Sequence, residues 1–326
     1  MKHNKLLQFC LILLILLPYS LYASSDSNTN KTYDDKKGYS SLALVKGNKV
    51  RLYSKLKVGN QSPEVLVIVD TGSSWLLLEE RFVSDYQETG RTIKTGYGYN
   101  KGTKHVVGKL VYADVTLNSI PKLIAKKVPI IMVPNGSIKG ISGILGLKIN
   151  TQNSLLNYLP KPYNEVVIID APNKKLTFTK SSKSLLKNYQ TFKLRKGGCS
   201  NLAAPIIPIN QVKCWQPGKI PITYTFVDDK GNVILKNTFG TLFDSGGVNT
   251  QFALAKLPNV LEKNSKDGYL KGKIKSAVFV GTNYQIPTTE HIKITKSMSN
   301  HINSGYLLFY DRTVLFDTVL GVVGIK

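Results

Sequence analysis

Two short phrases, each at the end of an apolar run, constrain this chain most. Asp70-Thr71-Gly72-Ser73-Ser74 follows the run Val65–Val69, and Asp244-Ser245-Gly246-Gly247 follows Thr241–Phe243. In both places the apolar residues predict a buried strand, and the small residues predict a turn directly after it. A buried carboxylate is costly unless it is hydrogen-bonded or paired. Two such carboxylates, one from each half of the chain, can meet that need by sharing one proton.

Short runs of Val, Ile, Leu, Tyr and Thr recur along the chain between Gly, Asn, Asp and Pro residues, and they predict a mostly β fold. The clearest predicted strands are 50–58, 65–69, 109–117, 128–133, 166–169, 222–227 and 233–235. Helical patterns are few. The predicted helices are 153–158, 181–189 and 252–257.

A weak internal repeat predicts two related lobes. Residues 53–70 read as a strand, a turn and a strand that ends at the first aspartate, and residues 222–244 repeat this plan up to the second. The apolar segment 166–170 likewise resembles 314–317. Each lobe is therefore expected to contribute one carboxylate.

The first residues have the organisation of an export signal. Lys2 and Lys5 give a basic start, residues 6–17 are almost wholly apolar, and Leu21-Tyr22-Ala23 offers a cleavage site. An uncleaved membrane anchor is the alternative, but the apolar stretch is short for a full span and is broken by Pro18. We expect a cleaved signal peptide and a secreted or periplasmic protein.

These patterns together predict the organisation of the whole chain. The segment after the signal is rich in Ser, Asn, Asp and Lys and lacks apolar periodicity, so a disordered lead-in is expected. The predicted boundaries are a signal peptide at 1–23, the lead-in at 24–38, an N-terminal β lobe at 39–180, a linker at 181–190 and a C-terminal β lobe at 191–326.

Cys199 and Cys214 are the two cysteines left once the signal peptide, with Cys10, is removed. An even pair in an exported chain favours one disulfide over two unpaired buried thiols. Two cysteines with no nearby histidine cannot form a zinc site. We expect no metal and no cofactor.

The chain carries a net charge of +24 at pH 7. Its lysines are spread out and are not accompanied by a tight basic run, zinc-finger spacing or interleaved aromatic residues, so no specific nucleic-acid partner is expected. The charge predicts a solvated cationic surface, which can attract an anionic envelope or polysaccharide weakly.

The two aspartate phrases resemble those of the pepsin-like aspartic peptidases, and the match extends over roughly residues 50 to 326. It includes the apolar residues 75–78 after the first phrase and the element Ile144-Leu145-Gly146. The C-terminal segments 305–310, 314–317 and 323–325 look like the closing strands of that family. The resemblance implies a bilobal, mostly β fold with a cleft between the lobes, a monomer, and an endopeptidase that cleaves extended peptides or proteins.

By this resemblance Asp70 and Asp244 are the catalytic pair, one removing a proton from water and the other hydrogen-bonding the scissile carbonyl. Ser73 would orient the Asp70 carboxylate, and Gly72 and Gly246 would donate backbone N–H groups. The expected supporting residues are Thr71, Gly72, Ser73, Ser245 and Gly246.

Gly247 departs from the family pattern, because many members have Thr or Ser at this position. A hydroxyl donor to Asp244 is therefore expected to be missing, which would raise the pKa of the carboxyl pair. The surrounding positive charge acts in the opposite direction, within the limits of salt screening. We expect an activity optimum less acidic than that of pepsin.

A hairpin at 95–102 is the candidate for the flap that covers the cleft in this family. Tyr97 is the expected flap tyrosine and Tyr99 the alternative, and an ordinary surface hairpin is the competing interpretation. Trp75 stands where the family often has Asn. The alternative function is a catalytically inactive pepsin-fold binding or inhibitor protein, although both aspartates are retained.

Overall fold

The structure is a computed structural model. It describes residues 39–326 except 44, 47–50, 98–103, 139, 200–211, 229, 249, 257–272, 281–284, 287–292, 299 and 310. The predicted signal peptide at 1–23 and lead-in at 24–38 lie outside the described residues.

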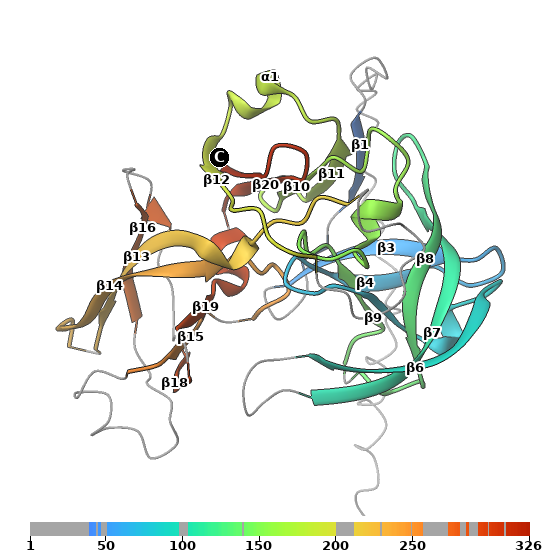
Figure 1. Cartoon of the computed structure of the whole chain (residues 1–326), viewed down its shortest axis with the longest axis horizontal. Coiled ribbons are helices and arrows are strands. Elements are labelled where there is room, and N and C mark those ends of the chain that lie inside the picture. Colours follow the sequence, from blue (N-terminus) through green and yellow to red (C-terminus); the bar gives the residue numbers. More distant parts are fainter. Residues whose placement is uncertain are drawn as a thin grey trace, which may run out of the picture. The chain divides into compact units, whose positions relative to one another are not determined.

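The fold is mostly β, as predicted, and its strands form three sheets (Figure 1). The first sheet has eight strands and is built from the part of the chain that contains Asp70. In sheet order these are β2 (Val45–Lys46), β3 (Leu52–Val58), β4 (Val65–Asp70), β9 (Gly143–Gly146), β5 (Leu76–Glu79), β8 (Leu123–Val133), β7 (Lys104–Leu117) and β6 (Gln87–Tyr97).

The second sheet has seven strands and is built from the part of the chain that contains Asp244. In sheet order these are β17 (Gln285–Ile286), β16 (Lys273–Phe279), β13 (Ile220–Val227), β14 (Val233–Leu242), β19 (His301–Asn303), β15 (Gln251–Leu254) and β18 (Lys293–Lys296).

The third sheet has six strands and takes them from both halves of the chain. In order they are β1 (Tyr39–Ala43), β11 (Lys175–Thr179), β10 (Val166–Asp170), β20 (Thr313–Asp317), β21 (Val322–Ile325) and β12 (Gln190–Lys193). The two segments that resemble each other in sequence, β10 and β20, are antiparallel neighbours in this sheet. The lobe boundaries remain a prediction.

The predicted strand–turn–strand repeat is present in both halves. β3 pairs antiparallel with β4, which ends at Asp70, and β13 pairs antiparallel with β14, which ends two residues before Asp244. Each second strand also has a parallel partner, β9 for β4 and β19 for β14. The two aspartates therefore leave equivalent strands.

Both aspartate loops begin on buried strands. Val67 and Val69 of β4 are fully buried, and Phe243 is fully buried directly before Asp244. Burying one such side chain contributes about 1.5–3 kcal/mol, so each loop is anchored to a well-packed core.

Helical segments are short in the described part of the chain. They are the 3₁₀ helices η2 (Glu80–Phe82), η4 (Leu155–Tyr158), η6 (Pro217–Lys219) and η7 (Gly305–Phe309) and the α-helix α1 (Lys183–Leu186). η4 and α1 lie within the predicted helices 153–158 and 181–189. None of the described helices is long and apolar enough to cross a membrane.

The helix predicted at 252–257 is wrong. Gln251–Leu254 forms β15, which runs parallel to β18 and antiparallel to β19. The ring of Phe252 packs edge-on against those of Tyr224 and Phe226, with centroids 4.8 and 4.5 Å away. A short apolar run buried on both faces lacks the alternation of an exposed strand, so its sequence resembles that of a buried helix.

The strand expected at 305–310 is also wrong, because Gly305–Phe309 forms η7. Gly305 has a φ of +58°, which turns the chain away from the extended direction of β19. The N–H of Tyr306 then donates to the carbonyl of Gly247 at 2.7 Å. The strands expected at 314–317 and 323–325 are present as β20 and β21.

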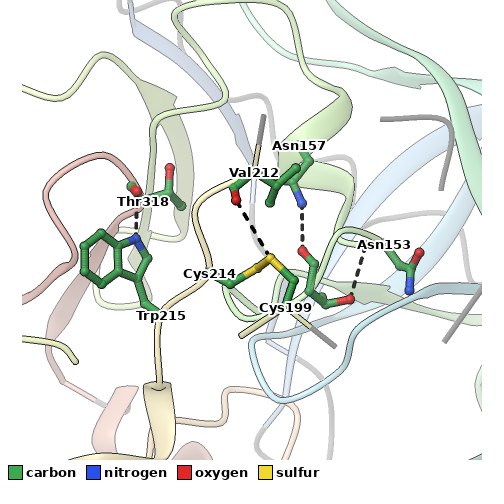
Figure 2. Close-up of a disulfide and its surroundings, with 8 residues drawn as sticks. Asn153, Asn157, Cys199, Val212, Cys214, Trp215 and Thr318 are labelled. Atoms are coloured by element: carbon green, nitrogen blue, oxygen red, sulfur yellow. Dashed lines mark hydrogen bonds between the residues drawn. A yellow bond between two sulfur atoms is a disulfide. The ribbon is translucent and has the colours of Figure 1, made fainter. Parts of the chain in front are cut away.

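The predicted disulfide is present between Cys199 and Cys214 (Figure 2). Directly after it, Nε1 of Trp215 donates to the carbonyl of Thr318 at 2.8 Å, and the backbone N–H of Trp215 donates to Ile149 at 3.2 Å. The disulfide thus closes a loop whose end is fixed to two distant parts of the chain.

Candidate active site

Asp70, the last residue of β4, is held by three hydrogen bonds from its own loop. Its Oδ1 accepts from the N–H groups of Gly72 at 2.8 Å and Ser73 at 2.9 Å. Its Oδ2 accepts from the Ser73 hydroxyl at 2.7 Å. The small residues predicted as a turn therefore bring their N–H and hydroxyl groups to the Asp70 carboxyl, as in an Asx turn.

Asp244 is held in a matching way at its first oxygen. Its Oδ1 accepts from the N–H groups of Gly246 at 3.0 Å and Gly247 at 3.2 Å. The backbone N–H of Asp244 itself donates to the Ser304 hydroxyl at 3.1 Å.

The Asp244 loop supplies no hydroxyl donor, as expected, but the conclusion that the carboxyl therefore lacks a side-chain donor is wrong. Nδ2 of Asn303 makes a short hydrogen bond to Oδ2 of Asp244. The donor comes from β19, the parallel neighbour of β14, and so lies outside the loop motif on which the expectation was based. A missing donor therefore gives no reason for a less acidic optimum.

The two loops are cross-linked by reciprocal hydrogen bonds through Thr71 and Ser245. The Thr71 hydroxyl donates to the carbonyl of Phe243 at 2.8 Å and accepts from the Ser245 N–H at 3.0 Å. The Ser245 hydroxyl donates to the carbonyl of Val69 at 2.8 Å and accepts from the Thr71 N–H at 3.2 Å. Both side chains are buried, so these bonds fix one loop against the other.

The carboxyls of Asp70 and Asp244 lie in close contact, each against the glycine of the opposite loop. A Cβ added to Gly72 would stand 2.6 Å from Cγ of Asp244, and one added to Gly246 would overlap the carboxyl of Asp70. Any larger residue at either position would clash with a carboxyl of the pair, so both positions require glycine.

The pKa of Asp70 is raised to about 8, first by burial and then by the neighbouring charge of Asp244. The hydrogen bonds from the Ser73 hydroxyl and the Gly72 N–H act in the opposite direction. Two carboxyls in contact cannot both ionise at low cost, so between their two titration steps they hold one proton between them. The pair thus offers an acid and a base in one place.

A cavity of about 160 Å³ lies beside the Asp70 loop. One side is polar and comes from the loop and from β6, and the other is apolar. The lining residues are Gly72, Ser73, Ser74, Trp75, Leu77, Thr95, Gly96 and Ile144. Because Ser73 hydrogen-bonds Asp70, a group bound in this cavity would lie next to the carboxyl pair.

The hairpin predicted as the flap is formed by β6 and β7. Tyr97 ends β6, where its backbone is paired with Lys104 of β7. Tyr99 and the rest of the connection lie outside the described residues. Thr95 and Gly96 line the cavity from this hairpin, so the hairpin adjoins the site, and the identity of the flap tyrosine stays a prediction.

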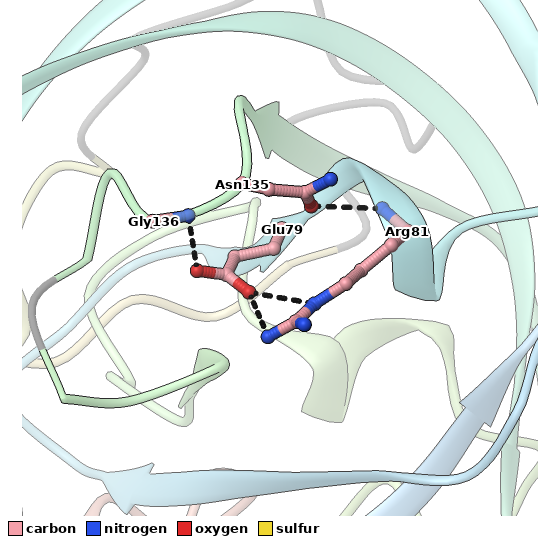
Figure 3. A network of polar contacts seen from close by, with 4 residues as sticks. All are labelled: Glu79, Arg81, Asn135 and Gly136. Carbon is pink, nitrogen blue, oxygen red and sulfur yellow. Dashed lines mark hydrogen bonds and ion pairs between the residues drawn. The ribbon is translucent and has the colours of Figure 1, made fainter.

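A buried carboxylate, that of Glu79, joins two segments near the apolar side of the cavity, and Figure 3 shows its polar contacts. Glu79 is 3% exposed and forms an ion pair with Arg81 at 2.7 Å, and its Oε1 accepts from the N–H of Gly136 at 2.7 Å. This network holds the turn that carries Ile138, which packs in the same apolar cluster as Trp75. Trp75, which is 5% exposed, is therefore packed in a cluster that includes a residue of this turn.

Asn303 is the site residue that sequence reasoning missed. Ile144 of β9 faces Ile68, two residues before Asp70, and Asn303 of β19 faces Leu242, two residues before Asp244. The two positions are equivalent, yet one is apolar and the other is a carboxamide. Ile144 and Asn303 lie at different sequence distances from their aspartates, so this difference is seen only from the strand register.

In the described part of the chain, no group of three or more His, Cys, Asp or Glu side chains is arranged to hold a metal ion.

Comparisons with known proteins find similarity to solved structures and none to family models or curated sequences. No family model and no curated protein matches the chain. The crystal structure of an aspartic proteinase from Irpex lacteus is 14% identical, covers 88% of this chain and 97% of its own, and has a TM-score of 0.58. The structure of edgp is 12% identical, covers 89% of this chain and 94% of its own, and has a TM-score of 0.55.

Proposed function

We propose that this chain, whose fold is that of the pepsin-like aspartic peptidases, is an endopeptidase that hydrolyses peptide bonds through a water activated by Asp70 and Asp244. The observation that carries the proposal is the contact between two carboxyls, each hydrogen-bonded by its own loop. The two loops are cross-linked through Thr71 and Ser245. Such a pair supplies a general base and a general acid without a metal or a nucleophilic side chain.

The reaction needs one carboxylate and one carboxylic acid. The carboxylate removes a proton from water, whose oxygen bonds to the scissile carbonyl carbon. The acid hydrogen-bonds the carbonyl oxygen and stabilises its developing negative charge. Collapse of the tetrahedral intermediate breaks the C–N bond, and a proton of the pair goes to the departing amine. Both products leave and the pair again holds one proton.

The pH range of this reaction follows from the two protonation states. Activity falls at low pH when the base is protonated and at high pH when the acid is ionised. Because the pKa of Asp70 is raised to about 8, activity extends toward neutral pH. An optimum less acidic than that of pepsin stays a prediction, which the pH range of the cleavage experiment tests.

The substrate is an extended peptide or protein segment. The cavity beside Ser73 supports this, because its apolar side, formed by Trp75, Leu77 and Ile144, suits an apolar side chain next to the scissile bond. The β6–β7 hairpin adjoins the same cavity and would shield the reaction from water, with Tyr97 as its tyrosine.

The protein acts outside the cytoplasm, either secreted or in the periplasm. The export signal at 1–23 and the Cys199–Cys214 disulfide support this location. It acts as a monomer. Its net charge of +24 provides a weak, salt-sensitive attraction to anionic envelope or polysaccharide.

The experiment is cleavage of an unbiased peptide library by the purified protein from pH 3 to 8, with and without pepstatin, a mimic of the tetrahedral intermediate. Cleavage that pepstatin blocks is expected, and the cleaved bonds would give the side-chain preference. A well-folded protein that cleaves nothing at any pH would overturn the proposal and favour the inactive binding or inhibitor protein.

A further inference from the structure

The second oxygens of the two carboxyls have chemically different partners. Oδ2 of Asp70 is bonded to the Ser73 hydroxyl, which can donate a hydrogen bond or accept one. Oδ2 of Asp244 is bonded to the carboxamide nitrogen of Asn303, which can only donate. The remaining oxygen of each carboxyl receives two backbone N–H groups.

The orientation of the Asn303 carboxamide is fixed by a second hydrogen bond. Its Oδ1 accepts from the N–H of Gly305 at 2.8 Å, and a flipped amide would place its NH₂ group against this N–H. Asn303 is 8% exposed, so no bulk water replaces either partner. The NH₂ group therefore has to face Asp244.

We propose that Asn303 is a positioning residue that holds Asp244 as the carboxylate of the pair and leaves the shared proton to Asp70. This inference rests on the proposed function. Apart from the Asp70 carboxyl, a proton on either oxygen of Asp244 would face only donors. A proton on Oδ2 of Asp70 has a further acceptor, the Ser73 hydroxyl, once that hydroxyl rotates. Asp244 is then the base that takes the proton of water, and Asp70 is the acid that hydrogen-bonds the carbonyl.

Gly247 makes room for this arrangement. A Cβ at position 247 would stand 3.4 Å from Oδ2 of Asp244, so a hydroxyl carried there could reach the carboxylate. The same Cβ would stand 3.2 Å from Oδ1 of Asn303 and 2.9 Å from Cα of Gly305. A hydroxyl-bearing residue at 247 and the Asn303 carboxamide therefore compete for one place, and this chain uses the carboxamide.

Besides the pair itself, the charged or titratable groups that act on this part of the site are His301, Lys148 and Lys219. His301 lies on β19 two residues from Asn303, and burial, followed by Lys148 and Lys219, lowers its pKa. Asp244 acts in the opposite direction on His301, as expected when a carboxylate stands nearby.

The test removes the donor and follows the protonation of the pair. Asn303→Leu keeps the size of the side chain but cannot donate, and Asn303→Asp keeps its shape. In both, the acid limb of the pH profile of kcat/KM is expected to move up by about one to two pH units, since a hydrogen bond to a charged group is worth about 1.5–3 kcal/mol. An acid limb that stays in place in both folded variants would overturn the proposal.

A second readout does not depend on cleavage. Carboxyl ¹³C NMR of aspartate-labelled wild-type protein and Asn303→Leu is expected to show the lower titration of the pair rising in the variant. If the wild-type protein cleaves nothing, the proposed function fails while this titration still decides the role of Asn303. An unshifted lower titration would overturn that role even in an active enzyme.

Matched variants separate this role from a general loss of packing. Asn237→Ala removes an exposed carboxamide on β14 and is expected to leave the pH profile unchanged. Gly247→Ser combined with Asn303→Val returns a hydroxyl from the loop, and we expect its acid limb to move back toward the wild-type position. A shift of equal size in Asn237→Ala would contradict the proposal.

Discussion

The Asp70 half and the Asp244 half of the site share one backbone plan but hold their carboxyls by different chemistry. In each, a strand with a parallel neighbour ends at a loop whose N–H groups bind one carboxyl oxygen. The other oxygen takes its donor from the loop in the first half, through Ser73, and from the neighbouring strand in the second, through Asn303. Equivalent backbones can therefore set unequal protonation preferences.

The two halves differ at two positions, one in the loop and one in the neighbouring strand, and the two differences compensate each other. Ser73 and Ile144 occupy the loop and strand positions of the first half, and Gly247 and Asn303 occupy those of the second. Where the loop carries the donor, the strand is apolar and Ile144 lines the cavity. Where the strand carries the donor, the equivalent loop position is Gly247, which has no side chain.

The comparison predicts that the two glycines of the Asp244 loop differ in importance. Gly246→Ala is expected to lower kcat/KM by about 10²-fold or more, because its Cβ overlaps the Asp70 carboxyl and displaces it. Gly247→Ala meets the Gly305 Cα at 2.9 Å and is expected to cost about tenfold. Steady-state kinetics on one peptide measures both, and equal losses would contradict the proposed close contact.

The reciprocal cross-link predicts a loss of stability when one hydroxyl is removed. Thr71→Val leaves the Phe243 carbonyl and the Ser245 N–H without their partners in a buried place, and should lower the free energy of unfolding by about 2–4 kcal/mol. Urea unfolding measures this. The matched control is Thr238→Val on the exposed face of β14, expected to cost about 0.5 kcal/mol or less.

The raised pKa of Asp70 predicts a pH-dependent stability. Between the ordinary value of 3.8 and about 8 the folded protein binds this proton more tightly than the unfolded chain does. Its contribution is therefore complete below pH 3.8 and is lost as the pH rises toward 8. Asp70→Asn should remove this loss of stability with rising pH, measured by urea unfolding at several pH values. Parallel profiles for the two proteins would contradict the assignment.

The Glu79 network beside the Trp75 cluster predicts the smallest effect on stability and kinetics. Glu79→Gln keeps the side-chain shape but weakens the bonds to Arg81 and the Gly136 N–H, and should lower stability by about 1 kcal/mol. Because this network stands behind the cavity wall, KM should rise while kcat changes little. Thermal unfolding and peptide kinetics measure the two effects, and a fall in kcat alone would contradict a role confined to the cavity wall.

The sequence was sufficient wherever a local signal was strong. The strands before both aspartates, the hairpin repeat, the disulfide and the mostly β class were predicted correctly, because each depends on apolar runs, turn residues or an even cysteine count. The predictions for 252–257 and 305–310 were wrong where tertiary packing decides: Phe252 is enclosed by aromatic rings, and Gly305 turns under the Asp244 loop.

Asn303 could not be found from the loop motif, because its role depends on the register between β14 and β19. No local pattern states that register. The same limit applies to the cross-link between Thr71 and Ser245, whose partners are 174 positions apart in sequence. The role of Asn303 and the Thr71–Ser245 cross-link are seen only in the folded structure, where the strands and loops of the site are in contact.

The measurement that tests the central claim most directly is the rate of cleavage of one peptide by wild-type protein, Asp70→Asn and Asp244→Asn under identical conditions. Each substitution keeps the shape of the side chain but removes a carboxyl that must act as acid or base. The account predicts that both variants fold normally and lose at least about 10³-fold in kcat/KM. Cleavage at the wild-type rate by either folded variant would contradict it.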